Sequence, residues 1–177
     1  LFLWMTVAAE GLWSTIRLTH AESNAVRVEV TGEQFQWYFR YPGTDAVYGQ
    51  TKPELIDAAG GNPLGLDPAD PHGEDDVVSS ILVLPVNRQT NLRLVALDVI
   101  HGFYIPAMRV MQNATPGHVS EIHMTPTRIG DYPIVCTQLC GLGHYRMHAV
   151  ARVVSERDFT VWMAQHEAQR QAEVAGR

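Results

Sequence analysis

The chain has 177 residues, enough for one well-buried domain with some additional segments. Hydrophobic residues make up 46% of it, a fraction that is typical of globular proteins. The 13 Lys and Arg residues are outnumbered by 19 Asp and Glu residues, which gives a formal charge of -6. Nucleic acid is therefore not expected as a partner, because little in the chain could neutralise a phosphate backbone.

The chain begins with an apolar run, LFLWMTVAAEGLW, whose first charged residue is Glu10. This run is shorter than the roughly 20 apolar residues that a helix needs to cross a bilayer. It also lacks the basic residues and the small-residue cleavage site that flank a signal peptide. We expect residues 1–16 to be the end of a transmembrane helix and residues 17–25 to be a polar linker that leads into water.

Residues 26–154 are expected to form one domain of many short strands. Apolar and polar residues alternate in AVRVEVTGEQFQWYFRYPG, and β-rich runs return in SSILVLPVNRQTNLRLVALDVI, GHVSEIHMT and HAVARVVS. Short strands separated by turn signals, with little helix between them, indicate an all-β sandwich or barrel.

Two segments differ from this pattern. Residues 43–78 are rich in Gly, Pro and Asp and hold eight acidic residues but one basic residue, Lys52. We expect a loop insertion there, either merely solvated or used as a docking surface for a basic partner. Residues 155–177 predict a C-terminal helix, with Ser155 as its N-cap and an acid, Asp158, three residues later.

The only two cysteines lie in the stretch CTQLCGLGHYRM, at Cys136 and Cys140. They could be inert buried thiols, and a disulfide between them would close a very small loop that adds little stability. A zinc site usually needs paired Cys and His knuckles, and a thioredoxin-like pair has two intervening residues where this chain has three. The haem-attachment pattern C-x-x-C-H is also absent.

The loop does match a soft-metal site. A blue-copper site takes Cys, His and a weak Met ligand from one loop and a second His from upstream, and Cys140, His144 and Met147 have that form. Cys136 adds a second thiolate, and two thiolates can bridge two copper ions. Of the seven remaining histidines we select His101, because it follows the apolar strand LRLVALDVI at a Gly break, from which its imidazole could reach a neighbouring loop.

Four stretches, in this order, resemble subunit II of the haem-copper cytochrome c oxidases: EQFQWYFRYPG, LDVIHGFYIPAMRV, TPGHVSEIHMTP and GDYPIVCTQLCGLGHYRM. The resemblance covers most of the chain, from Val26 to Met163. It implies a cupredoxin-like Greek-key β-sandwich that carries the binuclear CuA centre. This domain would face the periplasm, on a membrane anchor in the bacterial cytoplasmic (inner) membrane.

The resemblance also assigns the ligands. Cys136 and Cys140 would be the bridging thiolates, and His101 and His144 the terminal imidazoles. The weak ligands would be the thioether of Met147 and the backbone carbonyl of Gln138. We further expect Asp98, three residues before His101, to orient an imidazole.

Two positions depart from the family pattern. Many members have a glutamate where this chain has Gln138, and its side chain also holds a magnesium ion at the border with subunit I. A neutral amide is a poorer ligand for a hard cation, so a magnesium ion at this border is possible but doubtful. Trp37 matches the family's QWYW element, in which Phe39 replaces the last tryptophan. The resemblance makes Trp37 the residue at which an electron from cytochrome c enters, although such an aromatic could simply fill the core.

The predicted function is electron transfer within a terminal respiratory oxidase. Cytochrome c would dock on acidic surface, and the electron would pass through the copper centre to haem in subunit I, where oxygen is reduced and protons are pumped. Other oxidase subunits and the membrane are further expected partners. Two alternatives remain: the CuA domain of a nitrous oxide reductase-like enzyme, and a copper-delivery or thiol-redox protein that uses Cys136 and Cys140.

Overall fold

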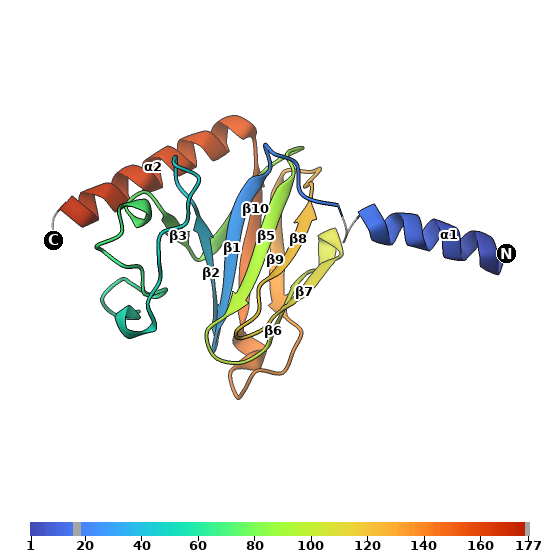
Figure 1. Ribbon diagram of the computed structural model, residues 1–177, viewed down its shortest axis with the longest axis horizontal. Helices are drawn as coiled ribbons and strands as arrows, with labels where there is room; N and C mark the ends of the chain where they lie inside the picture. The colour runs from blue at the N-terminus through green and yellow to red at the C-terminus, as the bar shows by residue number, and fades with distance from the viewer. Residues whose placement is uncertain (16–18, 176–177) are drawn as a thin grey trace.

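The computed structural model describes residues 1–15 and 19–175, and its centre is a sandwich of two five-stranded β-sheets (Figure 1). In spatial order, the first sheet consists of β3 (Val77–Ser79), β2 (Gln36–Tyr41), β1 (Val26–Glu33), β5 (Thr90–Ala96) and β8 (Ser120–Met124). The second consists of β4 (Ile81–Pro85), β10 (His148–Val154), β9 (Gly130–Cys136), β6 (His101–Ile105) and β7 (Val110–Ala114). Strand β1 runs parallel to β5, and β4 runs parallel to β10. The predicted all-β sandwich is confirmed.

The core lies between the two sheets and follows the two-residue period of the strands. Val28 and Val30 of β1 are fully buried, as are Leu92 and Leu94 of β5. Successive side chains of a strand point to opposite faces, so the alternation in the sequence places one apolar row of each strand inward. A short 3₁₀ helix, η4 (Pro106–Met108), connects β6 to β7.

The predicted C-terminal helix is present as α2 (Glu156–Ala175). The Ser155 hydroxyl accepts a hydrogen bond from the Asp158 backbone N–H (3.1 Å), which caps the first turn. Phe159 is buried, and the Trp162 ring lies 5.0 Å from the ring of Tyr41 on β2. The start of α2 therefore packs on the sandwich. Residues 176 and 177 of the predicted helix lie outside the described residues.

The N-terminal apolar run forms α1 (Phe2–Trp13), and none of its side chains is buried. Among the described residues, no helix has the length and apolarity that crossing a membrane requires. Residue 16 of the predicted membrane segment and residues 17–18 of the predicted linker lie outside the described part of the chain. The membrane segment stays a prediction.

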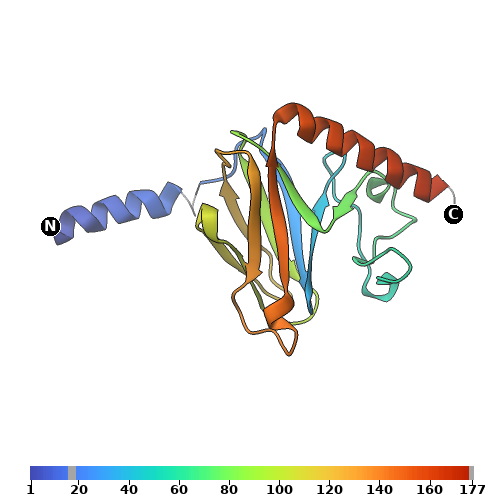
Figure 2. The ribbon, with the colours of Figure 1, turned by 180° about the vertical axis from the view of Figure 1, so that it is seen from behind.

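The predicted insertion at residues 43–78 has little regular structure apart from two 3₁₀ helices, η2 (Pro53–Leu55) and η3 (Pro71–Gly73), and β3 at its end. Both ribbon views show it beside β2, β3 and α2, apart from the loop between β9 and β10 (Figure 1, Figure 2). Six of its eight acidic side chains accept hydrogen bonds from the insertion itself or from β2: Asp45, Asp57, Asp67, Asp70, Asp75 and Asp76. Most of the acids therefore hold the insertion together, and a docking role for them stays a prediction.

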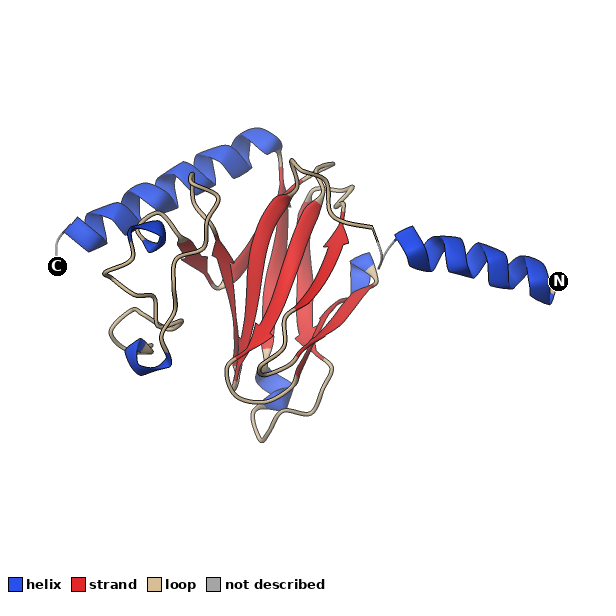
Figure 3. Cartoon of the chain, viewed as in Figure 1, coloured by secondary structure: helices blue, strands red, loops and turns tan. Residues whose placement is uncertain are grey.

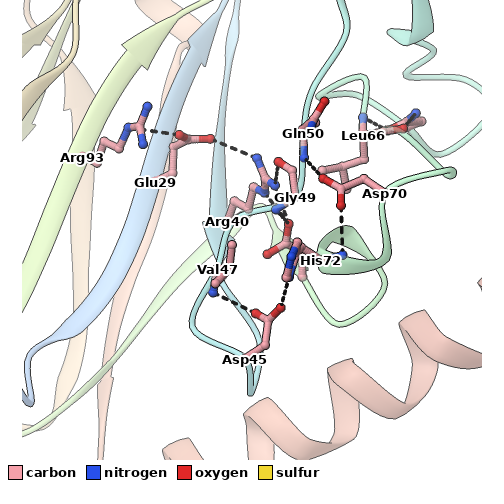
Figure 4. Close-up of polar contacts among 12 residues, drawn as sticks. Glu29, Arg40, Asp45, Val47, Gly49, Gln50, Leu66, Asp70, His72 and Arg93 are labelled. Carbon is pink, nitrogen blue, oxygen red and sulfur yellow. Dashed lines mark hydrogen bonds and ion pairs between the residues drawn. The ribbon is translucent and has the colours of Figure 1, made fainter.

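A buried arginine anchors the insertion to the first sheet (Figure 4). Arg40 of β2 is 2% exposed, and its guanidinium donates to the Asp76 carboxylate, with Nε 2.8 Å from Oδ2, and to the Gly49 carbonyl. On its other side, Arg40 Nη1 lies 3.5 Å from Glu29 of β1, and Glu29 also pairs with Arg93 of β5 at 3.4 Å. This network explains how a segment with little core of its own keeps a fixed position on the sheet.

Candidate metal centre

The two cysteines lie on the connection between β9 and β10, at one end of the sandwich (Figure 3). Cys136 is the last residue of β9, and the short 3₁₀ helix η5 (His144–Arg146) ends the loop before β10 begins. Strand β9 also pairs with β6, which places Phe103 opposite Cys136, and the Thr137 N–H donates to the Gly102 carbonyl (2.9 Å). This pairing brings the loop next to His101, the first residue of β6.

Sulfur and nitrogen donors converge around Cys140. Its Sγ lies 3.9 Å from Cys136 Sγ, 3.7 Å from Met147 Sδ and 3.6 Å from His144 Nδ1. The ligand atoms of His101, Cys136 and Cys140 all lie within 4.8 Å of one another. Among the described residues, these three form the one group of His, Cys and acidic side chains that could hold a metal ion in this way.

The carbonyl oxygen of Gln138 also faces this cluster, because it lies 3.2 Å from Cys136 Sγ. The Gln138 residue itself is exposed. The structure thus brings together all six positions that the sequence suggested as ligands: His101, Cys136, Gln138, Cys140, His144 and Met147. Their role as copper ligands is a proposal, which is taken up below.

The cluster is shielded from water. His101 is fully buried, Met147 is 2% exposed, and Cys140 and Cys136 are 5% and 9% exposed. Burial raises the pKa of the Cys140 thiol to about 11, and the neighbouring Cys136 adds to the increase. Without a metal, this site therefore keeps the Cys140 thiol protonated at neutral pH, although a thiolate is the form that binds metals.

His101 is oriented as a metal ligand would be. Its Nε2 lies 2.8 Å from Oδ1 of Asp98, whose carboxylate can only accept, so the proton lies on Nε2. The other ring nitrogen, Nδ1, is buried and has no hydrogen-bond partner among the described residues. An unpaired buried acceptor is costly unless something else binds it. The soft donors around it and this free lone pair fit a copper ion.

Asp98 is held in turn by several donors. Burial alone would raise the pKa of its carboxyl, but hydrogen bonds from His101 and from the backbone N–H groups of Val99 and Gln34 outweigh burial and lower it. Asp98 thus stays ionised at neutral pH. The expectation that it orients an imidazole agrees with this geometry.

Trp37 lies next to the site but not at the surface. It is fully buried, and its ring centroid lies 5.8 Å from that of His101 and 5.4 Å from that of Phe103. A protein that docks on this end would therefore not touch the Trp37 ring. The predicted role of Trp37 in electron transfer stays a prediction, and its burial restricts that role to a position behind the surface.

The sequence reasoning missed two residues that touch the loop between β9 and β10: Gln34 and Phe35, which form the turn between β1 and β2. The Gln34 side-chain amide donates to the Cys140 carbonyl (2.5 Å). The partly buried Phe35 ring lies against Gly143. Their position could have indicated this role, because they come directly before the strand that contains Trp37.

Comparisons with known proteins agree with this architecture. A family model described as "Cytochrome C oxidase subunit II, periplasmic domain" matches residues 26–154. Over 161 residues the chain is 37% identical to "Alternative cytochrome c oxidase subunit 2" of Bradyrhizobium diazoefficiens, covering 90% of this chain and 57% of that protein. Over 141 residues it is 32% identical to cytochrome c oxidase subunit 2 of Thermostichus vulcanus, covering 80% of this chain and 33% of that one.

A solved structure shares the fold. The crystal structure of the periplasmic domain of subunit II of cytochrome oxidase (CoxB) of Bradyrhizobium japonicum aligns with a TM-score of 0.62 and 24% identity, over 85% of this chain and 99% of that one. The predicted cupredoxin-like sandwich is confirmed by this match. The chain spans only about half, or less, of the length of the two curated relatives. The chain belongs to the family of cytochrome c oxidase subunit II, of which it contains the periplasmic domain.

Proposed function

We propose that this chain is the electron-transfer subunit of a terminal respiratory cytochrome c oxidase. It would hold two copper ions, take electrons from cytochrome c and deliver them to haem in subunit I, where oxygen is reduced and protons are pumped. The observation that carries the proposal is the convergence of His101, Cys136 and Cys140 within 4.8 Å in a buried site at a loop end. Membership of the oxidase subunit II family supports it.

The donor set suits two copper ions. The thiolates of Cys136 and Cys140 would bridge the ions, and one imidazole would complete each side: His101 from β6 and His144 from the loop. Met147 Sδ and the Gln138 carbonyl would be the weak ligands. Soft sulfur favours Cu(I) and imidazole suits either oxidation state, so bound copper could accept and release one electron at this site.

The chain's own residues would keep the site rigid during this exchange. His101 begins a strand in the second sheet, and Cys136 ends the strand that pairs with it. The Cys136 N–H donates to the Met147 carbonyl (3.1 Å), which closes the loop at its base. Ligands fixed in this way move little when the charge of the site changes, and such preorganisation keeps the barrier to electron transfer low.

The outer surface of the copper loop suits contact with other proteins. Three large side chains of the loop, Leu139, Leu142 and Tyr145, are 77%, 97% and 80% exposed. Exposed apolar groups that cluster in this way mark interaction sites in many proteins. We assign this end to the contacts with the donor cytochrome and with the other oxidase subunits. Trp37, in van der Waals range of the His101 ring, would carry the electron inward from that surface.

The proposed location is the outer face of the bacterial cytoplasmic membrane, with the sandwich in the periplasm and residues 1–16 as part of the anchor. The description of the matching family as a periplasmic domain supports this. A magnesium ion at the border with subunit I would have to bind an exposed neutral amide at Gln138, which is a poor ligand for a hard cation. The magnesium site therefore stays a prediction with an unfavourable ligand at Gln138.

A stopped-flow experiment tests the proposed function. The full chain, purified in detergent and loaded with copper, is mixed with reduced cytochrome c, and the oxidation of the cytochrome is followed together with the copper absorbance. We expect both signals to change at the same rate. Cys140→Ser should abolish the reaction. A copper-loaded chain that reduced cytochrome c cannot reduce would contradict the proposal.

A further inference from the structure

The turn between β1 and β2, residues Gln34 and Phe35, contributes none of the proposed ligands but contacts both halves of the site. We propose that this turn positions the ligands: Gln34 ties the His101 side of the site to the cysteine loop, and Phe35 holds the loop in place. The importance of this positioning for copper rests on the proposed function. The contacts themselves can be tested without copper.

Gln34 makes two hydrogen bonds in different directions. Its backbone N–H donates to Oδ2 of Asp98 (2.7 Å), and Oδ1 of the same carboxylate accepts from His101 Nε2 (2.8 Å). Its side-chain Nε2 donates to the carbonyl of Cys140 (2.5 Å). Gln34 therefore links His101, through Asp98, to Cys140, although these two residues are 39 positions apart in the sequence.

Phe35 fits against the glycines of the loop. A Cβ atom at Gly143 would lie 2.3 Å from Phe35 Cδ2, and one at Gly141 would lie 2.8 Å from Gln34 Nε2. Real Cβ atoms do not approach other atoms so closely, so this fit requires glycine at both positions. Gly141 also has a φ of +139°, a conformation that other residues rarely adopt. The turn and the loop are thus complementary in shape.

The end of β1, next to the turn, packs against His101. A Cβ atom at Gly32 would lie 2.8 Å from Cδ2 of His101, so the backbone of β1 packs directly on the imidazole. The same Cβ atom would lie 3.0 Å from Cζ3 of Trp37, whose ring is edge-on to the imidazole with the two centroids 5.8 Å apart. The β1–β2 hairpin therefore contacts His101 through Gly32 and Trp37, and the cysteine loop through Gln34 and Phe35.

This arrangement adds to the backbone hydrogen bonds at the base of the loop, from Thr137 N–H to the Gly102 carbonyl and from Cys136 N–H to the Met147 carbonyl. Residues 137–147 contain the short helix η5 but no strand, and the side chains of Leu139, Leu142 and Tyr145 are exposed to solvent. Ligands on such a loop bind metal weakly unless contacts outside the ligand set hold them in place, because ordering them otherwise opposes binding. The turn supplies these contacts before any metal is present.

The first test replaces the side chain that bridges the two halves. Gln34→Met keeps the length of the side chain and the backbone N–H but removes the donor to Cys140, and it adds no charge. Gln36→Met, at the first residue of β2, is the matched control, because Gln36 is also exposed and its side chain makes no hydrogen bond to the loop among the described residues. Both variants are compared in the full chain, purified in detergent without copper.

The readout is the rate at which a thiol reagent labels Cys136 and Cys140 at fixed pH. Loss of one tie should open the loop more often, so labelling of Gln34→Met should be about 2- to 10-fold faster than that of Gln36→Met. Copper-loaded Gln34→Met should also lose copper to a chelator faster than the control, by a similar factor. Equal labelling rates in the two variants would overturn the proposal.

A second pair of variants tests the shape of the contact. Gly143→Ala should speed labelling because its methyl group collides with Phe35, and adding Phe35→Ala should slow it again by removing the collision. Effects that simply add would mean that Phe35 does not hold the loop, and would overturn that part of the proposal. A chain that binds no copper but shows these labelling differences would refute the proposed function while leaving the positioning role intact.

Discussion

Replacing Asp98 with Asn probes the contact on which the orientation of His101 depends. The change removes the charge from a hydrogen bond of 2.8 Å to a fully buried imidazole, and it turns one of the two carboxylate acceptors into a donor. The backbone N–H of Gln34, now 2.7 Å from Oδ2, would lose its acceptor or force the amide to turn. The proton on Nε2 would then be less firmly fixed, and Nδ1 less well directed at the metal.

The expected loss can be estimated from this geometry. A hydrogen bond to a charged group contributes about 1.5–3 kcal/mol, which corresponds to about a 10- to 100-fold change in an equilibrium constant. Losses of about 10- to 100-fold in metal affinity are also typical when a carboxylate behind a metal-binding histidine is removed. We therefore expect Asp98→Asn to bind copper about 10- to 100-fold more weakly.

Competition with a copper chelator measures this difference, and the electron paramagnetic resonance spectrum shows whether the site is also distorted. Asp131→Asn is the control, because Asp131 is an exposed acid whose partner is Arg152, on the neighbouring strand of the second sheet. If Asp98→Asn kept the copper affinity and spectrum of the control, the argument that this carboxylate orients His101 would be refuted.

Three other perturbations address the site and the fold. Met147→Leu should shift the reduction potential and alter the copper spectrum while changing the free energy of unfolding by less than about 1.5 kcal/mol, because the swap nearly conserves volume; an unchanged spectrum would remove Met147 from the ligand set. Because the pKa of the Cys140 thiol is raised to about 11, this thiol is protonated at pH 7, and copper must displace its proton. Copper affinity should therefore rise with pH between 6 and 9, with at least one proton released per chain in a calorimetric titration in different buffers, whereas a pH-independent affinity would contradict this. Arg40→Met should lower the free energy of unfolding in urea by about 3–5 kcal/mol, because it leaves the buried Asp76 carboxylate without its cationic partner and leaves Glu29 with Arg93 alone; a loss below about 1 kcal/mol would show that the network contributes little.

The local signals in the sequence predicted the strands, and they identified loop residues whose side chains converge in the structure. Cys140, His144 and Met147 lie on one loop, so their spacing alone limits how far apart they can be. His101 was found because a strand-end position next to Gly102 leaves room for an imidazole to reach a neighbouring loop, and the pairing of β6 with β9 provides that loop. The geometry of the loop residues is therefore local, whereas His101 reaches the loop only through the pairing of β6 with β9.

The remaining contacts depend on pairing between distant segments. Alternation along residues 35–39 indicates that Phe35, Trp37 and Phe39 share a face, but it does not say that the partly buried Phe35 packs against Gly143 of the loop while Trp37 is fully buried. The bond from Gln34 to Cys140 joins residues 106 positions apart. The burial of Arg40 likewise requires the insertion to fold back over β2, which its composition does not reveal.

The most direct test of the account is the copper content and spectrum of the full chain. After loading with copper, it should contain two copper ions per chain, and its electron paramagnetic resonance spectrum should show seven hyperfine lines, because one unpaired electron is shared equally by two copper nuclei. This result requires both Cys136 and Cys140 as bridging ligands. One copper ion per chain with a four-line spectrum, or retention of zinc in place of copper, would contradict the central claim.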